Sequence, residues 1–410
     1  MKQPNSHLIA DIRKEFPILE TKIHDDKPLI YLDNGASAQK PKCVIEAMSN
    51  IMQHCYSNVH RGLHYMSEQT TLAYENARKR IAGFLNADEK EIIFTNSATN
   101  AINLVAYAFG RHLLKKGDEV IVTLMEHHSN FVPWQILRDQ HGVVLKFAPV
   151  DQNGNLDLEA FAQLFSKKTK LVCVAHVSNV LGTLNPINKL ADMAHAHGAI
   201  ILVDGSQAVM HQPVDVKALD VDFYVFTGHK IYGPTGIGIL YGRYQLLDHM
   251  EPFMGGGEMI SSVTPEKSEW AKPPAKFEAG TPAIIEAIGL GRAIQFVEEI
   301  GFDTISAHEN FLLDAATNAL QTIEGLTIHG RAQQKGPIIS LSIKNLHPYD
   351  IATILDREGI ATRAGHHCAE PLAQCLNIGS TLRASMAIYN TVEEIDALVN
   401  GLSKAKKMLS

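Results

Sequence analysis

Lys230 is a side chain whose setting in this sequence favours covalent chemistry. It follows the short apolar run Phe223–Phe226 and precedes a glycine-rich segment that ends at Gly238. Such a run predicts a buried strand, and the glycines predict a turn at its end. A lysine amine that is shielded from water loses its charge readily and can attack a carbonyl group. Taken alone, the pattern fits equally well a solvated loop lysine beside a hydrogen-bonded His229.

Other polar groups also come directly after predicted strands. Because ligands of doubly wound sheets bind at the carboxyl ends of the strands, these groups should meet at one edge. After a strand that ends at Thr95, small residues and Thr99 open a helix, which favours an anion such as phosphate. A plain N-cap is the alternative role of Thr99. The further groups of this kind are Glu126-His127-His128, Ser178-Asn179, Asp204-Gly205-Ser206-Gln207 and Thr227-Gly228-His229-Lys230.

Together these groups suit a flat, phosphorylated aldehyde that contains a ring nitrogen. Lys230 would form a Schiff base with the aldehyde, and Asp204 would keep a pyridinium nitrogen protonated. The start of the helix, with its hydroxyl groups, would hold the phosphate. These features belong to pyridoxal 5'-phosphate, so the residues predict an enzyme that depends on this cofactor.

Cys368 is a second candidate for covalent chemistry. It ends the glycine-led segment Ala364-Gly365-His366-His367-Cys368, directly after Arg363. Two histidines and an arginine favour an accessible thiol of low pKa, and therefore a nucleophile. One alternative is a buried, small apolar residue. A metal ligand is another, but adjacent histidines do not easily face one ion and no second cluster completes a tetrahedral set, so we predict no metal site.

The composition excludes several classes of protein. The net charge of -7 argues against nucleic acid or an anionic membrane as a partner. Residues 1–22 lack the apolar core and cleavage site of a secretory signal, and no stretch is apolar for long enough to span a bilayer. Five sparse cysteines without a C-x-x-C motif indicate a reducing cytoplasm and no disulfides. The four cysteines that we expect to be structural are Cys43, Cys55, Cys173 and Cys375.

Short β-type runs alternate with helical patterns between residues 29 and 242, which predicts an α/β fold. Several of the strands are continuous apolar runs, as expected when helices cover both faces of a mainly parallel, seven-stranded sheet. The predicted strands are 91–95, 119–124, 143–149, 170–177, 199–203, 223–227 and 236–241. The predicted helices between them are 71–85, 101–114, 130–140 and 187–197.

The pattern changes after residue 250. Residues 251–282 are rich in glycine and proline, which predicts an irregular functional segment or a linker. A helix over 284–300 follows, and then a smaller α+β region with strands at 338–343 and 360–363 and a helix between Pro348 and Gly359. We predict a helical segment 1–22 that packs with the small domain, a large cofactor-binding domain 23–290 and a small C-terminal domain 291–410 that carries the Cys368 loop.

Motifs along nearly the whole chain form an ordered set. Its centre is Asp204–Gln207 followed by Thr227–Lys230. The other motifs are Tyr31-Leu32-Asp33-Asn34, His60-Arg61-Gly62, Glu126-His127-His128, Ser178-Asn179-Val180, Phe277–Pro282, Arg363–Cys368 and Arg383-Ala384-Ser385. The set resembles that of the cysteine desulfurases of the SufS/CsdA type, which belong to class V of the fold-type I pyridoxal-phosphate enzymes. A single motif is weak evidence for this resemblance, whereas the ordered set is strong evidence.

The resemblance implies how the cofactor is held. Lys230 would carry it and then move the α-proton of the substrate, and Asp204 would pair with the pyridine nitrogen. His127 would stack on the ring and shuttle a proton. The remaining implied cofactor residues are Gln207 at the ring oxygen and Ala98, Thr99, Thr227 and His229 at the phosphate.

The resemblance also implies the reaction. Asn179 and Arg383 would hold the substrate carboxylate, with Arg363 as a further binding residue. The thiolate of Cys368 would attack the sulfur of bound L-cysteine, release alanine and keep a persulfide for iron–sulfur cluster assembly. Selenocysteine lyase and cysteine-sulfinate desulfinase are alternatives within the same fold. A cofactor-free or metal-binding thiol protein that uses Cys368 for redox sensing is the alternative from another class.

Two protein partners are implied by the same resemblance. Gly280 and Thr281 match a family segment that reaches the phosphate of the partner subunit, which implies a homodimer with shared sites. The short loop Arg363–Cys368 resembles that of the family's second group, whose cysteine is held rigidly. We therefore expect slow turnover alone and faster turnover with a sulfur-acceptor protein of the SufE or SufU type.

Overall fold

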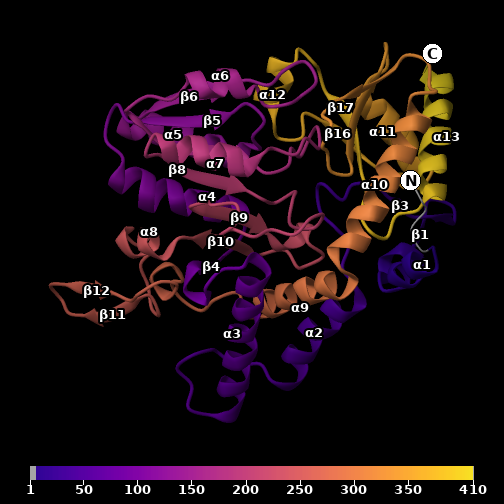
Figure 1. The fold of residues 1–410 in the computed structure, drawn as a ribbon. Coiled ribbons are helices and arrows are strands. Elements are labelled where there is room, and N and C mark those ends of the chain that lie inside the picture. The colour runs from indigo at the N-terminus through magenta and orange to yellow at the C-terminus, as the bar shows by residue number, and fades with distance from the viewer. Residues whose placement is uncertain (1–5, 410) are drawn as a thin grey trace.

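The computed structural model describes residues 6–409, and its larger sheet has seven strands in the order β4-β10-β9-β8-β7-β5-β6 (Figure 1). The strands from β9 to β6 pair in parallel, whereas β10 pairs antiparallel with both β9 and β4. The predicted seven-stranded, mainly parallel sheet is thus confirmed. The strands are β4 Ile92–Thr95, β5 Glu119–Thr123, β6 Val144–Ala148, β7 Thr169–Ala175, β8 Ile200–Asp204, β9 Phe223–Thr227 and β10 Gly238–Gly242.

Alternate residues of these strands enter two different apolar clusters. In β7, Val172 and Val174 belong to one cluster, while Leu171 and Cys173 belong to the other. Successive side chains of a strand point to opposite faces, so both faces of the sheet are buried. The covering helices are α3 Tyr65–Leu85, α7 Ile187–Ala196 and α9 Ile284–Ile300 in the first cluster, and α4 Ala98–Val105 and α5 Val132–His141 in the second.

The predicted elements differ from the observed ones mainly at their ends. The helix predicted over 101–114 begins at Ala98 and continues beyond α4 as a π-helical segment, Ala106–Arg111. The irregular segment predicted over 251–282 contains a hairpin of β11 Ile260–Val263 and β12 Ser268–Trp270, which projects from the body of the fold (Figure 1). Further short elements are β1 Lys22–Ile23, β2 Lys27–Pro28, α2 Lys42–His54, α6 Leu158–Gln163, α8 Tyr244–His249 and α12 Glu370–Cys375.

A second sheet has four strands in the order β13-β14-β17-β16. The strand predicted over 360–363 is wrong in one respect, because the chain changes its pairing partner there. β15, Ile360–Ala361, pairs with β3, Ile30–Tyr31, whereas β16, Arg363–Gly365, joins the four-stranded sheet. The other elements of this region are β13 Leu326–His329, β14 Ile338–Ile343, β17 Thr381–Ser385, α10 Phe302–Leu320, α11 Pro348–Arg357 and α13 Val392–Leu409.

The first part of the chain packs on the C-terminal region. In α1, Ser6–Lys14, Ile9 and Ile12 are buried, and Arg13 forms an ion pair with Glu394 of α13. β3, Ile30–Tyr31, pairs in parallel with β15. The proposed boundary at residue 290 lies within α9, which is one continuous helix that leads to α10 (Figure 1). The division into three parts therefore stays a prediction.

Candidate active site

Lys230 lies just beyond the end of a buried strand. All five residues of β9 are buried, and a 3-10 turn over Gly228–Lys230 carries the lysine out of the sheet. A Cβ atom at Gly228 would lie 2.6 Å from Cγ2 of Ile237, so the turn packs closely only with glycine there. Burial lowers the pKa of Lys230 to about 8, against the opposing effect of the Asp204 carboxylate.

The lowered pKa of Lys230 predicts how quickly the apoprotein captures an aldehyde cofactor at each pH. Only the neutral amine attacks a carbonyl, and with a pKa of about 8 its fraction rises from roughly one tenth at pH 7 to one half at pH 8. We expect the capture rate, followed by the absorbance of the bound cofactor, to rise about fivefold over this interval and to level off above pH 9. A rise of about tenfold per pH unit that continues to pH 10 would instead indicate an ordinary lysine.

Asp204 ends the strand beside that of Lys230. Asp204 is 8% exposed, and its Oδ1 accepts a hydrogen bond from the backbone N–H of Ser206 at 2.9 Å. A Cβ atom at the next residue, Gly205, would lie 2.1 Å from the hydroxyl of Tyr224, so this position requires glycine. The packing beneath the strand end therefore fixes the carboxylate at the edge of the sheet, where a protonated ring nitrogen would meet it.

The start of α4 provides a site for an anion. Oγ of Ser97 accepts a hydrogen bond from the backbone N–H of Asn100 at 3.1 Å, so Ser97 is the N-cap. The alternative role of Thr99 as the N-cap is therefore wrong. Oγ1 of Thr99 lies 2.7 Å from Oγ of Ser129 instead. The N–H groups of the first turn, which begins at Ala98, and these two hydroxyls suit a phosphate group.

Thr227 and His229 line the same cavity as Thr99. Burial lowers the pKa of His229 to about 4, and the charges of Lys230 and Lys40 act in the same direction. The imidazole is therefore neutral at pH 7 and can donate or accept a hydrogen bond without adding charge.

His127 faces this cavity from the loop after β5. Its Nδ1 accepts a hydrogen bond from the backbone N–H of Ser129 at 3.1 Å, which sets the orientation of the ring. Burial lowers the pKa of His127 to about 4, and the positive charge of Lys230 lowers it further. A neutral, oriented imidazole of this kind can stack on an aromatic ring and accept a proton.

Glu126 is a buried acid beside His127, and the sequence analysis assigned it no role. Its Oε1 accepts hydrogen bonds from Oγ1 of Thr123 at 2.5 Å and from the backbone N–H of Ala175 at 2.7 Å, and its Oε2 accepts one from Nδ2 of Asn130 at 2.6 Å. Burial raises the pKa of Glu126 to about 8, so the carboxyl group is mostly protonated at pH 7. It ties the loop that carries His127 to β7.

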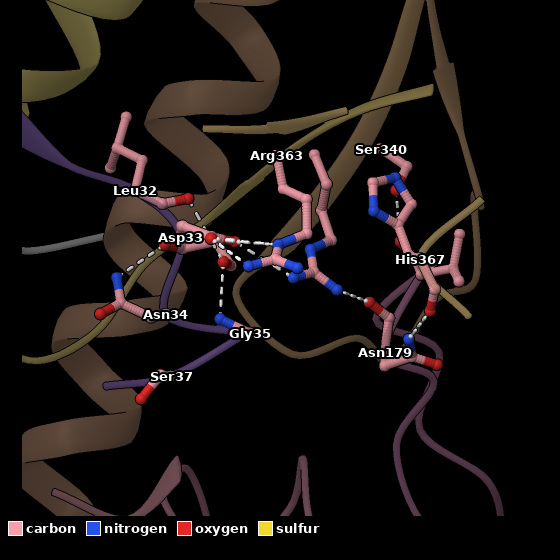
Figure 2. Close-up of polar contacts among 12 residues, drawn as sticks. Leu32, Asp33, Asn34, Gly35, Ser37, Asn179, Ser340, Arg363 and His367 are labelled. Carbon is pink, nitrogen blue, oxygen red and sulfur yellow. Dashed lines mark hydrogen bonds and ion pairs between the residues drawn. The ribbon is translucent and has the colours of Figure 1, made fainter. Parts of the chain in front are cut away.

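Arg363 and Arg383 reach the cavity from β16 and β17, where they are register partners. Arg383 is 2% exposed, and its Nη1 donates a hydrogen bond to the backbone oxygen of Asn179 at 2.9 Å. Nδ2 of Asn179 in turn donates to the backbone oxygen of His367 at 2.7 Å (Figure 2). The structure thus brings the three residues implied for substrate binding together with the Cys368 loop.

Asp33 holds both arginines, and the sequence analysis missed this role. Its Oδ2 lies 3.0 Å from Nη2 of Arg363, and its Oδ1 lies 3.2 Å from Nη2 of Arg383 (Figure 2). Asp33 stands in one of the motifs of the sequence analysis, but it follows no strand of the larger sheet. The pairing of β3 with β15 brings it to the arginines, and no local pattern predicts that pairing.

Cys368 is exposed and also lines the cavity. Its backbone oxygen accepts a hydrogen bond from the N–H of His128 at 2.8 Å. The backbone is left-handed at His367 and Cys368, with φ of 54° and 56°, which costs roughly 1–2 kcal/mol at each non-glycine residue. Ala369 and Leu372 then pack into a small apolar cluster against the end of the larger sheet. These contacts hold the thiol beside the cavity.

The cavity has a volume of about 230 Å³. The predicted site residues that line it are Ala98, Thr99, His127, Asn179, Asp204, Thr227, His229, Lys230, Arg363, Cys368 and Arg383. Gln207 does not line it, but its Nε2 donates a hydrogen bond at 2.7 Å to the backbone oxygen of Gly35, which does. Gly280 borders a separate cavity and Thr281 is exposed, so neither reaches the site of its own chain.

The groups around the cavity fit pyridoxal phosphate. Oγ of Ser206 and Nε of Arg383 are buried, and neither has a hydrogen-bond partner in the described chain. Such an atom costs about 1–3 kcal/mol when it is left unpaired, so both favour a polar ligand. The same cavity is lined by groups that match each part of the cofactor. They are an amine that can react with the aldehyde, a carboxylate that can pair with the ring nitrogen and a helix N-terminus that can bind the phosphate.

Comparison with known proteins decides the family. The model of the aminotransferase class-V family matches residues 30–398. This chain belongs to that family. A probable cysteine desulfurase of Halalkalibacterium halodurans is 48% identical over 404 residues, which cover 98% of each chain. A cysteine desulfurase of Escherichia coli strain SE11 is 47% identical over 403 residues, which cover 98% of this chain and 99% of the relative.

A solved structure agrees with this assignment. The apo structure of a cysteine desulfurase from Thermococcus onnurineus NA1 superposes with a TM-score of 0.93 at 39% identity, covering 100% of this chain and 99% of the other. The comparisons confirm the predicted resemblance to cysteine desulfurases, the fold-type I architecture, the expectation of an enzyme and its dependence on pyridoxal phosphate. The roles of the individual residues stay predictions.

Two further features concern the part of the chain that the structure describes. Within residues 6–409, no group of three His, Cys, Asp or Glu side chains is arranged to hold a metal ion. No helix in the same range is both long enough and apolar enough to cross a membrane.

Proposed function

We propose that this chain converts L-cysteine to L-alanine and keeps the released sulfur as a persulfide on Cys368. One observation carries the proposal: an exposed thiol, that of Cys368, and the amine of Lys230 line the same small cavity. The amine alone would suit an aminotransferase. The thiol adds a nucleophile that can accept the sulfur of the substrate.

The chain's own residues bind and orient the substrate. Arg383 and Asn179 hold its carboxylate, and the unpartnered Nε of Arg383 contributes a donor that is already desolvated. Lys230, with its lowered pKa, takes the α-proton as a general base. Pyridoxal phosphate supplies the electron sink that makes this proton acidic.

The thiolate of Cys368 attacks the sulfur of the oriented substrate. A sulfur–sulfur bond forms and the carbon–sulfur bond breaks. The electron pair of the broken bond stays on carbon, which takes up a proton and becomes the methyl group of alanine. Cys368–SH and cysteine thus become Cys368–S–SH and alanine, and no external oxidant or reductant is needed.

The persulfide passes to a separate acceptor protein of the SufE or SufU type in the cytoplasm, for the assembly of iron–sulfur clusters. The anchoring of the Cys368 loop supports a separate acceptor. The backbone oxygen of Cys368 is bound by the N–H of His128 at 2.8 Å, and the carboxylate of Glu370 contacts the ring of His128. A loop held in this way keeps the sulfur near the cavity, so an incoming thiol has to collect it there.

The working form is a homodimer in which Gly280 and Thr281 reach the phosphate site of the partner subunit. Their position supports this arrangement, because Thr281 is exposed and neither residue lines the cavity of its own chain.

Mass spectrometry of the holoenzyme after incubation with L-cysteine tests the proposal. We expect the peptide with Cys368 to gain the mass of one sulfur atom, and a reductant to remove it. The peptide with Cys375, a half-buried cysteine of the same region, is the internal control and should gain nothing. Alanine formation without a persulfide on Cys368 would contradict the proposal, as would the absence of alanine.

A further inference from the structure

Lys40 is a half-buried lysine that contacts the backbone of His229 and does not line the active-site cavity. Its Nζ donates hydrogen bonds to Oγ of Ser37 at 3.3 Å and to the backbone oxygen of His229, also at 3.3 Å. A third, shorter contact joins Nζ to the backbone oxygen of Ala38. All three acceptors are uncharged, so they hold the ammonium group in place without neutralising it.

No acid of the described chain balances this charge. Within residues 6–409, no carboxylate lies within ion-pair distance of Lys40, and burial lowers the pKa of Lys40 to about 8. At that pKa, about nine tenths of the side chains still carry the charge at pH 7. A partly desolvated cation without a counter-ion costs free energy, so this position favours an anion nearby.

The positive charge of Lys40 acts on the part of the cavity that suits a phosphate. It is one of the charges that lower the pKa of His229, whose side chain lines the cavity together with Thr99 and Thr227. These side chains and the hydroxyl of Ser129 are uncharged at pH 7. A phosphate monoester carries a charge of about -1.5 to -2 at that pH, so the groups that line its site leave most of this charge unbalanced.

The other cations around the cavity already have partners or tasks. Arg363 and Arg383 both form ion pairs with Asp33. The amine of Lys230 forms the link to the aldehyde. Lys40 therefore stands beside the phosphate site as a cation that no acid of the described chain neutralises.

The backbone around Lys40 is anchored independently of its side chain. The N–H of Gln39 donates a hydrogen bond to the hydroxyl of Tyr389 at 3.1 Å. On the other side of Lys40, the N–H of Lys42 donates to the backbone oxygen of Glu15 at 2.7 Å. A substitution at position 40 should therefore change the charge while this segment keeps its place.

We propose that Lys40 supplies the counter-charge of the cofactor phosphate and so selects pyridoxal phosphate over its phosphate-free form. Lys40 acts from behind the residues that line the site, through its charge and through the backbone of His229, so it is a positioning residue. This inference goes beyond the proposed function, because it concerns how the cofactor is retained and not which reaction follows.

Calorimetry of the apoprotein with pyridoxine 5'-phosphate and with pyridoxine tests this role. Neither ligand has an aldehyde, so neither links to Lys230, and the two ligands differ only in the phosphate group. The preference is the Kd for pyridoxine divided by the Kd for pyridoxine 5'-phosphate. In Lys40→Gln, which keeps a hydrogen-bond donor but loses the charge, we expect this preference to fall at least about tenfold. Lys40→Arg keeps the charge and should keep most of the preference.

Lys42→Gln is the matched control, because it removes an exposed lysine two residues away and should leave the preference unchanged. If Lys40→Gln does not fold, Lys40→Met removes the same charge with an unbranched apolar side chain, and its preference should fall as far.

Three results would overturn the role of Lys40. They are an equal loss of affinity for both ligands in the uncharged variant, a preference that stays unchanged, and a preference that Lys40→Arg loses as fully as Lys40→Gln. The formation of alanine enters none of these measurements. Their outcome is therefore independent of the proposed function.

Discussion

Replacing Cys368 with serine is expected to lower the formation of alanine from L-cysteine at least about 10³-fold, because the nucleophile that accepts the sulfur is lost. The substitution changes only one atom of an exposed side chain, so the fold and the bound cofactor should persist. Alanine formed from L-cysteine is the measurement, and the absorbance of the cofactor reports that the site is intact. Cys375→Ser is the control, since Cys375 lies in α12 outside the cavity and its loss should change the rate little.

The serine variant also separates the alternative activities. A selenocysteine lyase would keep its release of selenide, because selenium can leave without a thiol to accept it. A thiol-based redox sensor would show no bound cofactor and no alanine in the unmodified protein. Alanine formation from L-cysteine that survives in Cys368→Ser would contradict the persulfide route.

Replacing Lys230 with alanine is expected to remove the covalent attachment of the cofactor and to lower turnover by about 10²- to 10⁴-fold, the usual contribution of a general base. Borohydride fixes the link between an amine and pyridoxal phosphate, so treatment of the unmodified holoenzyme followed by peptide mapping should find the label on Lys230. In Lys230→Ala the label should be absent.

Lys335 is the internal control for this experiment. Burial lowers its pKa to about 8, as it does for Lys230, but Lys335 donates its hydrogen bond to the backbone oxygen of Gly330 at 3.0 Å and does not line the cavity. If a low pKa alone decided the reaction, the label would appear on both lysines. A label on Lys335 that survives in Lys230→Ala would contradict the assignment of the site.

Local patterns were enough to predict the elements that carry most of the site. β9, β14 and α9 have the bounds that the sequence predicts, because each is a clear apolar run or helical pattern between turn residues. The groups at or just beyond the ends of β8 and β9, among them Asp204 and Lys230, converge because parallel strands end at one edge of a sheet. The positions of the strand ends in the sequence were therefore enough to predict which side chains meet at the cofactor site.

The contacts that the sequence did not predict are long-range ones. Asp33 reaches Arg363 and Arg383 only because β3 pairs with β15, far along the chain. Glu126 is an ordinary acid in the sequence, and its long-range partner is the backbone N–H of Ala175 in β7, 49 residues further along the chain. The roles of Asp33 and Glu126 both depend on distant partners that no local sequence pattern identifies.

The parallel pair of β3 and β15 also limits how this chain can be divided. A fragment that began at residue 291 would leave the edge of β15 unpaired, and unpaired strand edges favour association between copies. It would also lose Leu32 from the apolar cluster of the smaller sheet. Arg383, almost wholly buried, would lose the carboxylate that pairs with it. The C-terminal third of the sequence is therefore incomplete as a folding unit, because the first forty residues supply part of its core and part of its charge balance.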